Sequence, residues 1–389
     1  MSLPEESVNH RPTGGKSGVI MAILLFLAVI SVALFTYLNS QGIDITTASL
    51  GQLVSGSAEG GGEAEAEVLY DMPFDSREHP VFSAFKDFIL KVSKDGIRLL
   101  DKKGSEILTE TTPLNNPIIR TNGREFLVAD TGGQNVYVAD EGGILWKDSL
   151  DVNLRNADIS REGYVTLVTE SKRYKNEVRV YGTNGLELFR SIIANDFAVA
   201  AKISPSEKQM VIDGINTDGI KAVTGLRFLD MKGGDLGAVS LDSTDGLFPV
   251  ILYNKAGDLF AIGDRAVISL DGDGKTRWEL KFSSVAGACL TAGGKLAVLA
   301  GGAGGMRLAV YSAAGKELAA CDVDDGAKSV SAGGGLLAVS AQKEAAFYNE
   351  KCRPVGKYTS KYDITDVYFF SRKQAAVVTK NQVTVINIG

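Results

Sequence analysis

The stretch VISLDGDGKTRWEL, residues 267–280, combines an apolar run, a turn rich in small residues and a tryptophan. Its turn also matches parts of three ligand-binding motifs. The letters GKT at 274–276 match the end of a phosphate-binding loop, and D-x-D at 271–273 matches the start of a calcium-binding loop. S-x-D at 269–271, followed by Trp278, approximates the turn known as an Asp-box. Comparison with the rest of the chain decides whether this stretch binds a ligand or builds a fold.

The same phrase occurs eight times: alternating apolar residues, a turn-opening residue and, in most copies, a glycine two or three positions later. The turn-opening residues lie 37 to 48 residues apart, at Asp101, Asp140, Gly182, Asp230, Asp271, Ser312, Asn349 and Asn387. A period of about 40 residues in strand-rich sequence is typical of a β-propeller, in which four-stranded blades repeat around an axis. No amphipathic segment of the length that a helical solenoid needs lies between the copies. The sequence therefore predicts an all-β fold, an eight-bladed β-propeller.

The end of the chain predicts how the propeller closes. The last copy ends at Gly389, soon after its turn, so the eighth blade lacks a fourth strand. The segment 67–101 parallels 106–140 phrase for phrase, and in the second segment the run EILTETT is the outer strand of a blade. By this parallel, residues 67–74 form an outer strand that pairs beside residues 382–388, which removes the two open edges. Seven blades with an irregular extra hairpin is the alternative.

A long apolar segment precedes the repeats. Residues 18–38 read GVIMAILLFLAVISVALFTYL and carry no charge, which is the length and composition of a transmembrane helix. No small-x-small cleavage site ends the segment, so an anchor is favoured over a cleaved signal peptide. Because Arg11 and Lys16 precede it and acidic residues follow it, we predict a single-pass cell-membrane protein with a cytoplasmic tail at 1–17 and an extracytoplasmic propeller.

The segment between the apolar stretch and the repeats has a different composition. Residues 39–66 are rich in Gly, Ser, Thr, Ala and Glu, which is typical of a flexible tether. The propeller domain is therefore predicted to occupy residues 67–389.

Charge and residue usage exclude several functions. The net charge of −6 comes from interspersed charges, whereas nucleic-acid binding needs a concentrated positive surface. The chain has only two histidines, His10 and His79, which argues against Ser-His-Asp chemistry and histidine-ligated zinc in the propeller. The three cysteines, Cys289, Cys321 and Cys352, have no metal-binding spacing; one disulfide with a free thiol and three free thiols both remain open.

The ligand motifs at 267–280 each lack a required residue. A phosphate loop needs glycine where Ser269 stands, and a calcium loop of EF-hand type needs glycine where Thr276 stands and glutamate where Phe282 stands. Trp278 comes two residues too late for an Asp-box. We therefore predict no cofactor and no metal. Asp271 is expected to cap a hairpin between the third and fourth strands of the fifth blade.

The two copies that contain tryptophan carry a resemblance. NVYVADEGGILWKDSL and AVISLDGDGKTRWEL are similar to the repeats of quinoprotein-type, or PQQ-like, propellers, in which a tryptophan packs between blades. Trp146 and Trp278 keep this tryptophan, and Phe189, Leu108 and Leu318 lie at or near its place in other copies. A quinoprotein dehydrogenase carries a vicinal cysteine pair, which this chain lacks.

The chain as a whole resembles a family of membrane-anchored propeller proteins of Gram-positive bacteria whose function is unassigned. The resemblance rests on the apolar segment, the acidic tether and the stretches at 161–189 and 203–219. It implies a fold and a location and no activity.

One loop stands out as a candidate partner-binding site. Lys172, Arg173, Tyr174 and Lys175 lengthen the connection between the second and third strands of the third blade. An exposed loop rich in Tyr and Arg suits contacts with a protein or with an anionic wall polymer, and a solvated hairpin loop is the alternative. A second insertion lies at 216–219.

We therefore predict a non-catalytic scaffold at the cell surface that binds a protein or a polymer. The alternative is a hydrolase that acts on cell-wall or sugar polymers through paired carboxylates. A sensor is disfavoured because the short cytoplasmic tail offers no effector domain.

Overall fold

The structure is a computed structural model that describes residues 64–241, 246–302 and 304–389. The predicted cytoplasmic tail at 1–17, the transmembrane segment at 18–38 and the tether up to residue 63 lie outside the described residues. Within the described ranges, no helix has the length and apolarity needed to cross a membrane.

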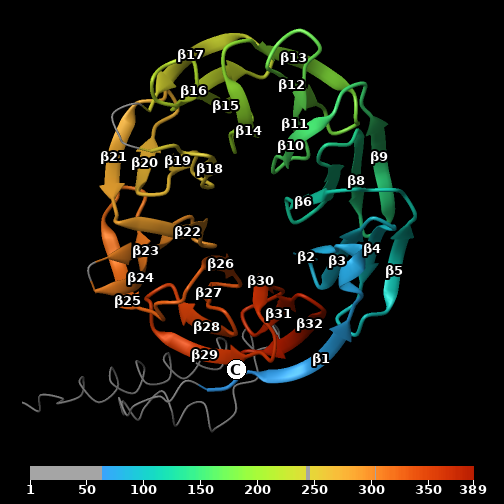
Figure 1. Cartoon of the computed structure of the whole chain (residues 1–389), viewed down its shortest axis with the longest axis vertical. Helices are drawn as coiled ribbons and strands as arrows, with labels where there is room; N and C mark the ends of the chain where they lie inside the picture. The colour runs from blue at the N-terminus through green and yellow to red at the C-terminus, as the bar shows by residue number, and fades with distance from the viewer. Residues whose placement is uncertain (1–63, 242–245, 303) are drawn as a thin grey trace, which may run out of the picture. The chain divides into compact units, whose positions relative to one another are not determined.

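The described chain is a β-propeller of eight four-stranded antiparallel sheets arranged in a ring (Figure 1). This arrangement confirms the predicted fold and the predicted number of blades. Blades 1 to 4 consist of β2 (Val81–Phe85), β3 (Phe88–Ser93), β4 (Gly96–Leu100) and β5 (Glu106–Glu110); β6 (Pro117–Thr121), β7 (Phe126–Asp130), β8 (Asn135–Asp140) and β9 (Gly143–Ser149); β10 (Leu154–Ile159), β11 (Val165–Glu170), β12 (Asn176–Tyr181) and β13 (Glu187–Ile193); and β14 (Phe197–Ile203), β15 (Gln209–Asn216), β16 (Val223–Asp230) and β17 (Asp235–Ser240).

Blades 5 to 8 continue the same order except at the last strand. They consist of β18 (Val250–Tyr253), β19 (Leu259–Ile262), β20 (Ala266–Leu270) and β21 (Thr276–Lys281); β22 (Ser284–Leu290), β23 (Leu296–Gly302), β24 (Gly305–Tyr311) and β25 (Glu317–Asp322); β26 (Ser329–Gly333), β27 (Leu336–Ser340), β28 (Glu344–Asn349) and β29 (Pro354–Thr359); and β30 (Ile364–Phe369), β31 (Gln374–Thr379), β32 (Gln382–Asn387) and β1 (Glu67–Pro73). A short 3-10 turn, η1 (Ser76–Glu78), leads from β1 into blade 1.

The outer strand of blade 8 comes from the start of the propeller, as predicted. β1 pairs antiparallel with β32, with Glu67 opposite Asn387 and Pro73 opposite Gln382. Upstream of β1, the backbone N–H of Ala66 donates to Lys357 O at 2.7 Å, and Glu65 forms a parallel bridge with Lys357 of blade 7. Residues 65–73 therefore contact two neighbouring blades, so the last residues of the predicted tether at 39–66 belong to the propeller.

Burial explains the two kinds of apolar pattern in the sequence. The second and third strands of each blade are covered by the adjacent blades on both faces, so they read as continuous apolar runs such as FLVAD in β7. The outer strands are largely exposed and alternate between exposed and half-buried residues, as in β9. The buried side chains form eight apolar clusters, one at each seam between neighbouring blades.

The stretch that opened the sequence analysis is a hairpin of blade 5, as predicted. Asp271 Oδ1 accepts hydrogen bonds from the backbone N–H groups of Asp273 and Lys275, at 3.0 and 2.9 Å. Gly274 completes the turn with a positive φ of 79°. The side chain that resembled a calcium ligand therefore caps the turn.

Outer-strand side chains of one blade pack on hairpin glycines of the next. Trp278 of blade 5 lies against the hairpin of blade 6, where its Nε1 donates to Ala313 O at 2.8 Å. A Cβ on Gly315 would lie 2.8 Å from the Trp278 ring. The same contact joins Trp146 to Gly185, Phe189 to Gly233 and Met72 to Gly104.

The tryptophan position of blade 6 is held by the residue next to Leu318. In blade 6, Ala319 occupies the place that Trp278 occupies in blade 5. Ala319 lies opposite Val310, next to the bulge in the outer strand. Leu318, which was expected at or near this place, is exposed. Blade 5 has the same bulge, and Trp278 follows its hairpin glycine by four residues just as Ala319 follows Gly315.

The antiparallel order gives the ring two distinct edges. One edge carries the connections between blades and the loops between second and third strands, and we call it the connection face. The other edge carries the hairpins between third and fourth strands, and we call it the hairpin face. Glu67 lies at the hairpin face, because it pairs with Asn387 at the far end of β32.

The seam contact predicts a large effect of adding a methyl group at Gly315. This residue has a φ of 76°, so alanine is strained there and its Cβ also overlaps Trp278. We expect Gly315→Ala to lower the free energy of unfolding by about 2–5 kcal/mol. The control is Gly257→Ala, because Gly257 has a φ of 92° in a similar turn and no atom within 4 Å of an added Cβ. Chemical denaturation should show a loss of only about 1–2 kcal/mol for the control; equal losses would contradict the packing argument.

A buried carboxyl group lies in the seam between blades 4 and 5. Asp213 of β15 is fully buried, on the same face of its strand as Val211, and neither carboxyl oxygen has a hydrogen-bond partner among the described residues. Loss of hydration raises the pKa of Asp213 to about 7. In the unfolded chain this carboxyl titrates near pH 3.9.

Asp213 therefore predicts a pH dependence of stability. Between about pH 4 and pH 7 the folded protein holds a proton that the unfolded chain releases, so the free energy of unfolding falls as the pH rises and levels off above pH 7. Asp213→Asn removes this contribution, and the variant should gain roughly 1–2 kcal/mol relative to the natural chain between pH 5 and pH 7. Denaturation at several pH values measures the difference, and a constant difference across this range would refute the assignment.

Candidate functional site

The predicted partner-binding loop connects β11 and β12 and lies on the connection face of blade 3. Ser171 orders it: the Ser171 Oγ accepts from the backbone N–H groups of Arg173 and Tyr174, at 3.4 and 3.3 Å. The same hydroxyl donates to Glu177 Oε1 at 3.0 Å. The loop therefore presents a defined turn, with Arg173 and Tyr174 at its tip.

Lys172 is directed to a charged network at the side of the loop. Its Nζ lies 3.4 Å from Asp151 Oδ2, and the other oxygen of Asp151 accepts from the buried Arg179 at 2.6 Å. The hydrogen bond from Arg179 holds the pKa of Asp151 at about 2. The charge of Lys172 is thus shared with a carboxylate that remains ionised.

Lys175 joins the loop to blade 4. Its Nζ donates to Asn195 O at 2.6 Å and to Asp218 Oδ1 at 3.0 Å. The same ammonium lies 4.7 Å from the centre of the Phe197 ring, which is a cation–π contact. Asp218 belongs to the second insertion, at 216–219, so Lys175 connects the two inserted loops.

Three exposed apolar residues lie on the segments that Lys175 joins. Tyr174, Phe197 and Ile220 have relative exposures of 46%, 48% and 106%. Together with Arg173 and Lys175 they form what we call the blade 3–4 patch. Large apolar side chains that cluster on a connected surface are typical of protein-binding sites.

The sequence pointed to only part of this patch. Lys172, Arg173, Tyr174 and Lys175 were singled out, whereas Phe197 and Ile220 were missed. Phe197 begins an inner strand directly after a polar connection, and Ile220 lies in a loop between β15 and β16 that is otherwise polar and glycine-rich. An apolar residue in such a loop was the available signal for Ile220.

The charges around the patch are mixed in sign. Lys172 and Lys175 form ion pairs within the chain, and the described structure shows no partner for the side chain of Arg173. Asp151, Asp196 and Asp218 lie on the same face as the cations. A polyanion needs a dominant positive field, so this surface suits a protein partner better than an anionic polymer.

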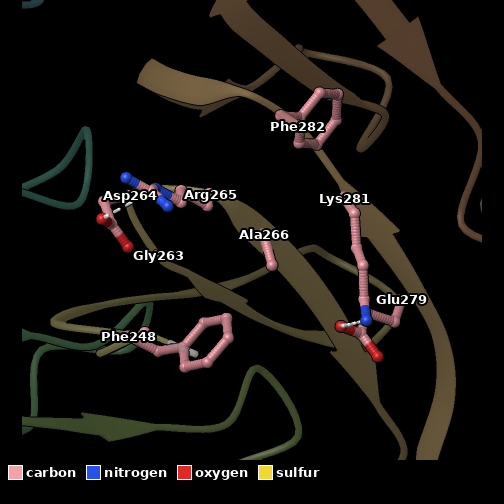
Figure 2. Close-up of a pocket in the computed structure, with 9 residues that line it drawn as sticks. Phe248, Gly263, Asp264, Arg265, Ala266, Glu279, Lys281 and Phe282 are labelled. Atoms are coloured by element: carbon pink, nitrogen blue, oxygen red, sulfur yellow. Dashed lines mark ion pairs between the residues drawn. The ribbon is translucent and has the colours of Figure 1, made fainter. Parts of the chain in front are cut away.

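A cavity of about 210 Å³ lies in blade 5 on the connection face (Figure 2). Figure 2 shows Phe248 and Phe282 on opposite sides of it, with Asp264 beside Arg265 and Glu279 beside Lys281. These ion-pair distances are 3.9 and 3.6 Å. The cavity is smaller than the roughly 300–1,000 Å³ of typical ligand pockets.

The hydrolase alternative depends on where the carboxylates lie and on what neighbours them. In the blade 5 cavity, Asp264 and Glu279 each lie beside a cation. On the inner strands, Asp158 is paired with Lys202 at 2.7 Å. Asp213 holds a proton near neutral pH, but it is enclosed between blades where no substrate reaches it. Asp366 of the inner strand β30 is the exposed acid whose pKa is raised by desolvation in its surroundings, and no ion pair with a cation is formed by it among the described residues.

Solved structures with the same fold are similar to the chain only at the level of architecture. BamB from Moraxella catarrhalis is 12% identical with a TM-score of 0.55, and the match covers 83% of this chain and 99% of BamB. Saccharomyces cerevisiae Sqt1 is 9% identical with a TM-score of 0.61, and the match covers 83% of this chain and 99% of Sqt1. The C-terminal WD40 domain of Sif2 is 13% identical with a TM-score of 0.60, covering 85% of this chain and all of that domain.

Sequence comparison identifies a family and no characterised relative. No curated protein matches the sequence significantly. A family of unknown function, DUF5711, matches residues 64–388, which is the propeller almost from end to end. The chain therefore belongs to the DUF5711 family.

Proposed function

We propose that this protein is a non-catalytic scaffold that binds another protein through the blade 3–4 patch. The observation that carries the proposal is the exposed set of Tyr174, Phe197 and Ile220, on segments of two blades that Lys175 joins through Asp218 and Phe197. Tyr and Arg are enriched among the residues that dominate binding energy at protein interfaces. The patch has such residues at its centre and paired charges at its rim.

The patch is also preorganised. Ser171 fixes the turn, and Lys175 is held by Asn195, Asp218 and the Phe197 ring. Side chains that are already ordered lose less conformational entropy when a partner binds. The β-sheets of blades 3 and 4, which carry the patch, also limit the backbone entropy that is lost on binding.

We further propose that the propeller is held at the cell surface by the apolar segment at 18–38, and that the part of the predicted 39–66 tether before residue 64 links the two. The first strand of the propeller begins at the hairpin face, where Glu67 pairs with Asn387. The blade 3–4 patch is on the connection face, at the opposite edge of the ring. This separation supports a patch that stays accessible to a partner.

Site-specific photo-crosslinking in intact cells tests the binding surface. A photoreactive phenylalanine derivative at position 174 of the full-length protein should capture a partner protein. The matched control carries it at Leu186, which is 65% exposed in the blade 3 hairpin on the other face. Phe197→Ala and Ile220→Ala should each reduce the yield at position 174 roughly tenfold, because each removes an interface anchor worth about 1–2 kcal/mol.

Three outcomes would count against the proposal. Equal capture of the same proteins from positions 174 and 186 would show no preference for the patch. Yields unaffected by both alanine substitutions would show that Phe197 and Ile220 do not bind the partner. A cross-linked product that resists protease and contains carbohydrate would identify a polymer as the ligand instead of a protein.

A further inference from the structure

The hairpin of blade 7 departs from the pattern of the other hairpins. Cys352 occupies the position that glycine occupies at Gly104, Gly185, Gly274 and Gly315, and it has a φ of 55°. The turn itself is the same: Asn349 Oδ1 accepts from the backbone N–H groups of Lys351 and Arg353. A non-glycine residue is strained in this conformation, so the side chain at 352 needs a physical reason.

The preceding blade provides the space for this side chain. At most other seams the hairpin glycine lies under a large side chain, such as Trp278 against Gly315. At the seam between blades 6 and 7 the equivalent outer-strand residue is Ala319. The small residue has moved from the hairpin to the outer strand, and the Cys352 thiol extends into the seam, where it is 5% exposed.

The Cys352 thiol meets a second thiol in this seam. Cys352 Sγ lies 3.8 Å from Leu308 O, and Leu308 is the register partner of Cys321 on the outer strand of blade 6. Cys321 packs in the same apolar cluster, and the two thiols share a hydrogen bond. Two cysteines that are 31 positions apart in the sequence are therefore in contact across a blade boundary.

We propose that Cys321 and Cys352 are a reversible dithiol–disulfide pair that covalently links blade 6 to blade 7 when it is oxidised. The oxidant is a disulfide, either a low-molecular-weight one or that of a protein dithiol oxidase. The Cys321 thiolate attacks one sulfur of the oxidant. This attack joins Cys321 to that sulfur in a mixed disulfide and releases the other half of the oxidant as a thiol. The Cys352 thiolate then attacks the Cys321 sulfur and releases the second thiol, so two protein thiols are oxidised and one disulfide is reduced to two thiols.

The surroundings of the two thiols fit these roles. The hydrogen bond from Cys352 lowers the pKa of the Cys321 thiol, and Cys321 is only partly buried, so it is the accessible nucleophile. Cys352 is buried beside it, and its hydrogen bond to Cys321 raises the pKa of the Cys352 thiol, so Cys352 reacts second, as the resolving thiol. Cys289 packs against the same cluster, but no hydrogen bond joins it to either thiol among the described residues, and burial raises its pKa to about 12, so it is the internal control.

Peptide mapping tests the pair directly and does not depend on whether the protein binds a partner. The reduced full-length chain is incubated with oxidised glutathione, its remaining thiols are alkylated, and the digest is analysed by mass spectrometry. We expect peptides containing Cys321 and Cys352 to be joined and Cys289 to be alkylated. Because the bond closes a loop across a seam, the melting temperature should rise by about 5 °C on oxidation. Cys289→Ala should leave both results unchanged.

Cys352→Gly is the matched variant, because glycine accepts the backbone conformation at this position and the hairpin should fold normally. This variant should lose the oxidant-dependent rise in melting temperature and keep glutathione on Cys321 as a mixed disulfide. Alkylation of both Cys321 and Cys352 in the oxidised natural chain would overturn the proposal. So would glutathione that remains on Cys321 in the natural chain, or a disulfide that includes Cys289.

Discussion

The pairing of β1 with β32 is the constraint on which the whole propeller depends. Each blade buries its apolar faces only against its two neighbours, so eight blades have eight covered seams only when the ring is closed. Without β1, blade 8 would expose the backbone edge of β32, and the seam to blade 1 would lose Leu69, Met72 and Phe74. An open edge of this kind favours pairing with other chains. Closure by the first strand also joins distant parts of the sequence, so blade 8 forms only once residues 382–387 are available to pair with β1.

The seams show how a repeated fold tolerates sequence divergence. The contact between an outer strand and the next hairpin occurs as Trp against Gly, Phe against Gly and Met against Gly. Between blades 6 and 7 the same contact is made by Ala319 and Cys352. Here the larger side chain comes from the hairpin and the smaller one from the outer strand. The requirement at each seam is a filled space and not a particular residue, because dense packing is what the interior needs. This explains why only two copies keep the tryptophan of quinoprotein-type repeats.

The fold was predictable from the sequence because its signals are local. Period-2 apolar runs, turn-opening Asp or Asn residues and hairpin glycines recur within each blade, and the blade count and the closing strand follow from their spacing. The site was predictable only in part, because its geometry depends on contacts between blades. Tyr174 stands out in the sequence, whereas the link from Lys175 to Asp218 and Phe197 requires two blades to be adjacent. The pairing of Cys321 with Cys352 depends in addition on a bulge that sets which side chains of β25 face blade 7.

The same ion pairs that organise the blade 3–4 patch also determine its selectivity. Lys172 and Lys175 appear in the sequence as two of three clustered cations, but each is held by a carboxylate of the chain. Their stems and the Phe197 ring add apolar area, while their charges contribute little net field. Binding at such a surface depends on shape and apolar contact, with Arg173 as the cation that has no partner in the described structure. A protein surface with a complementary hollow and one acidic group meets these requirements, whereas a uniformly charged polymer meets only the last of them.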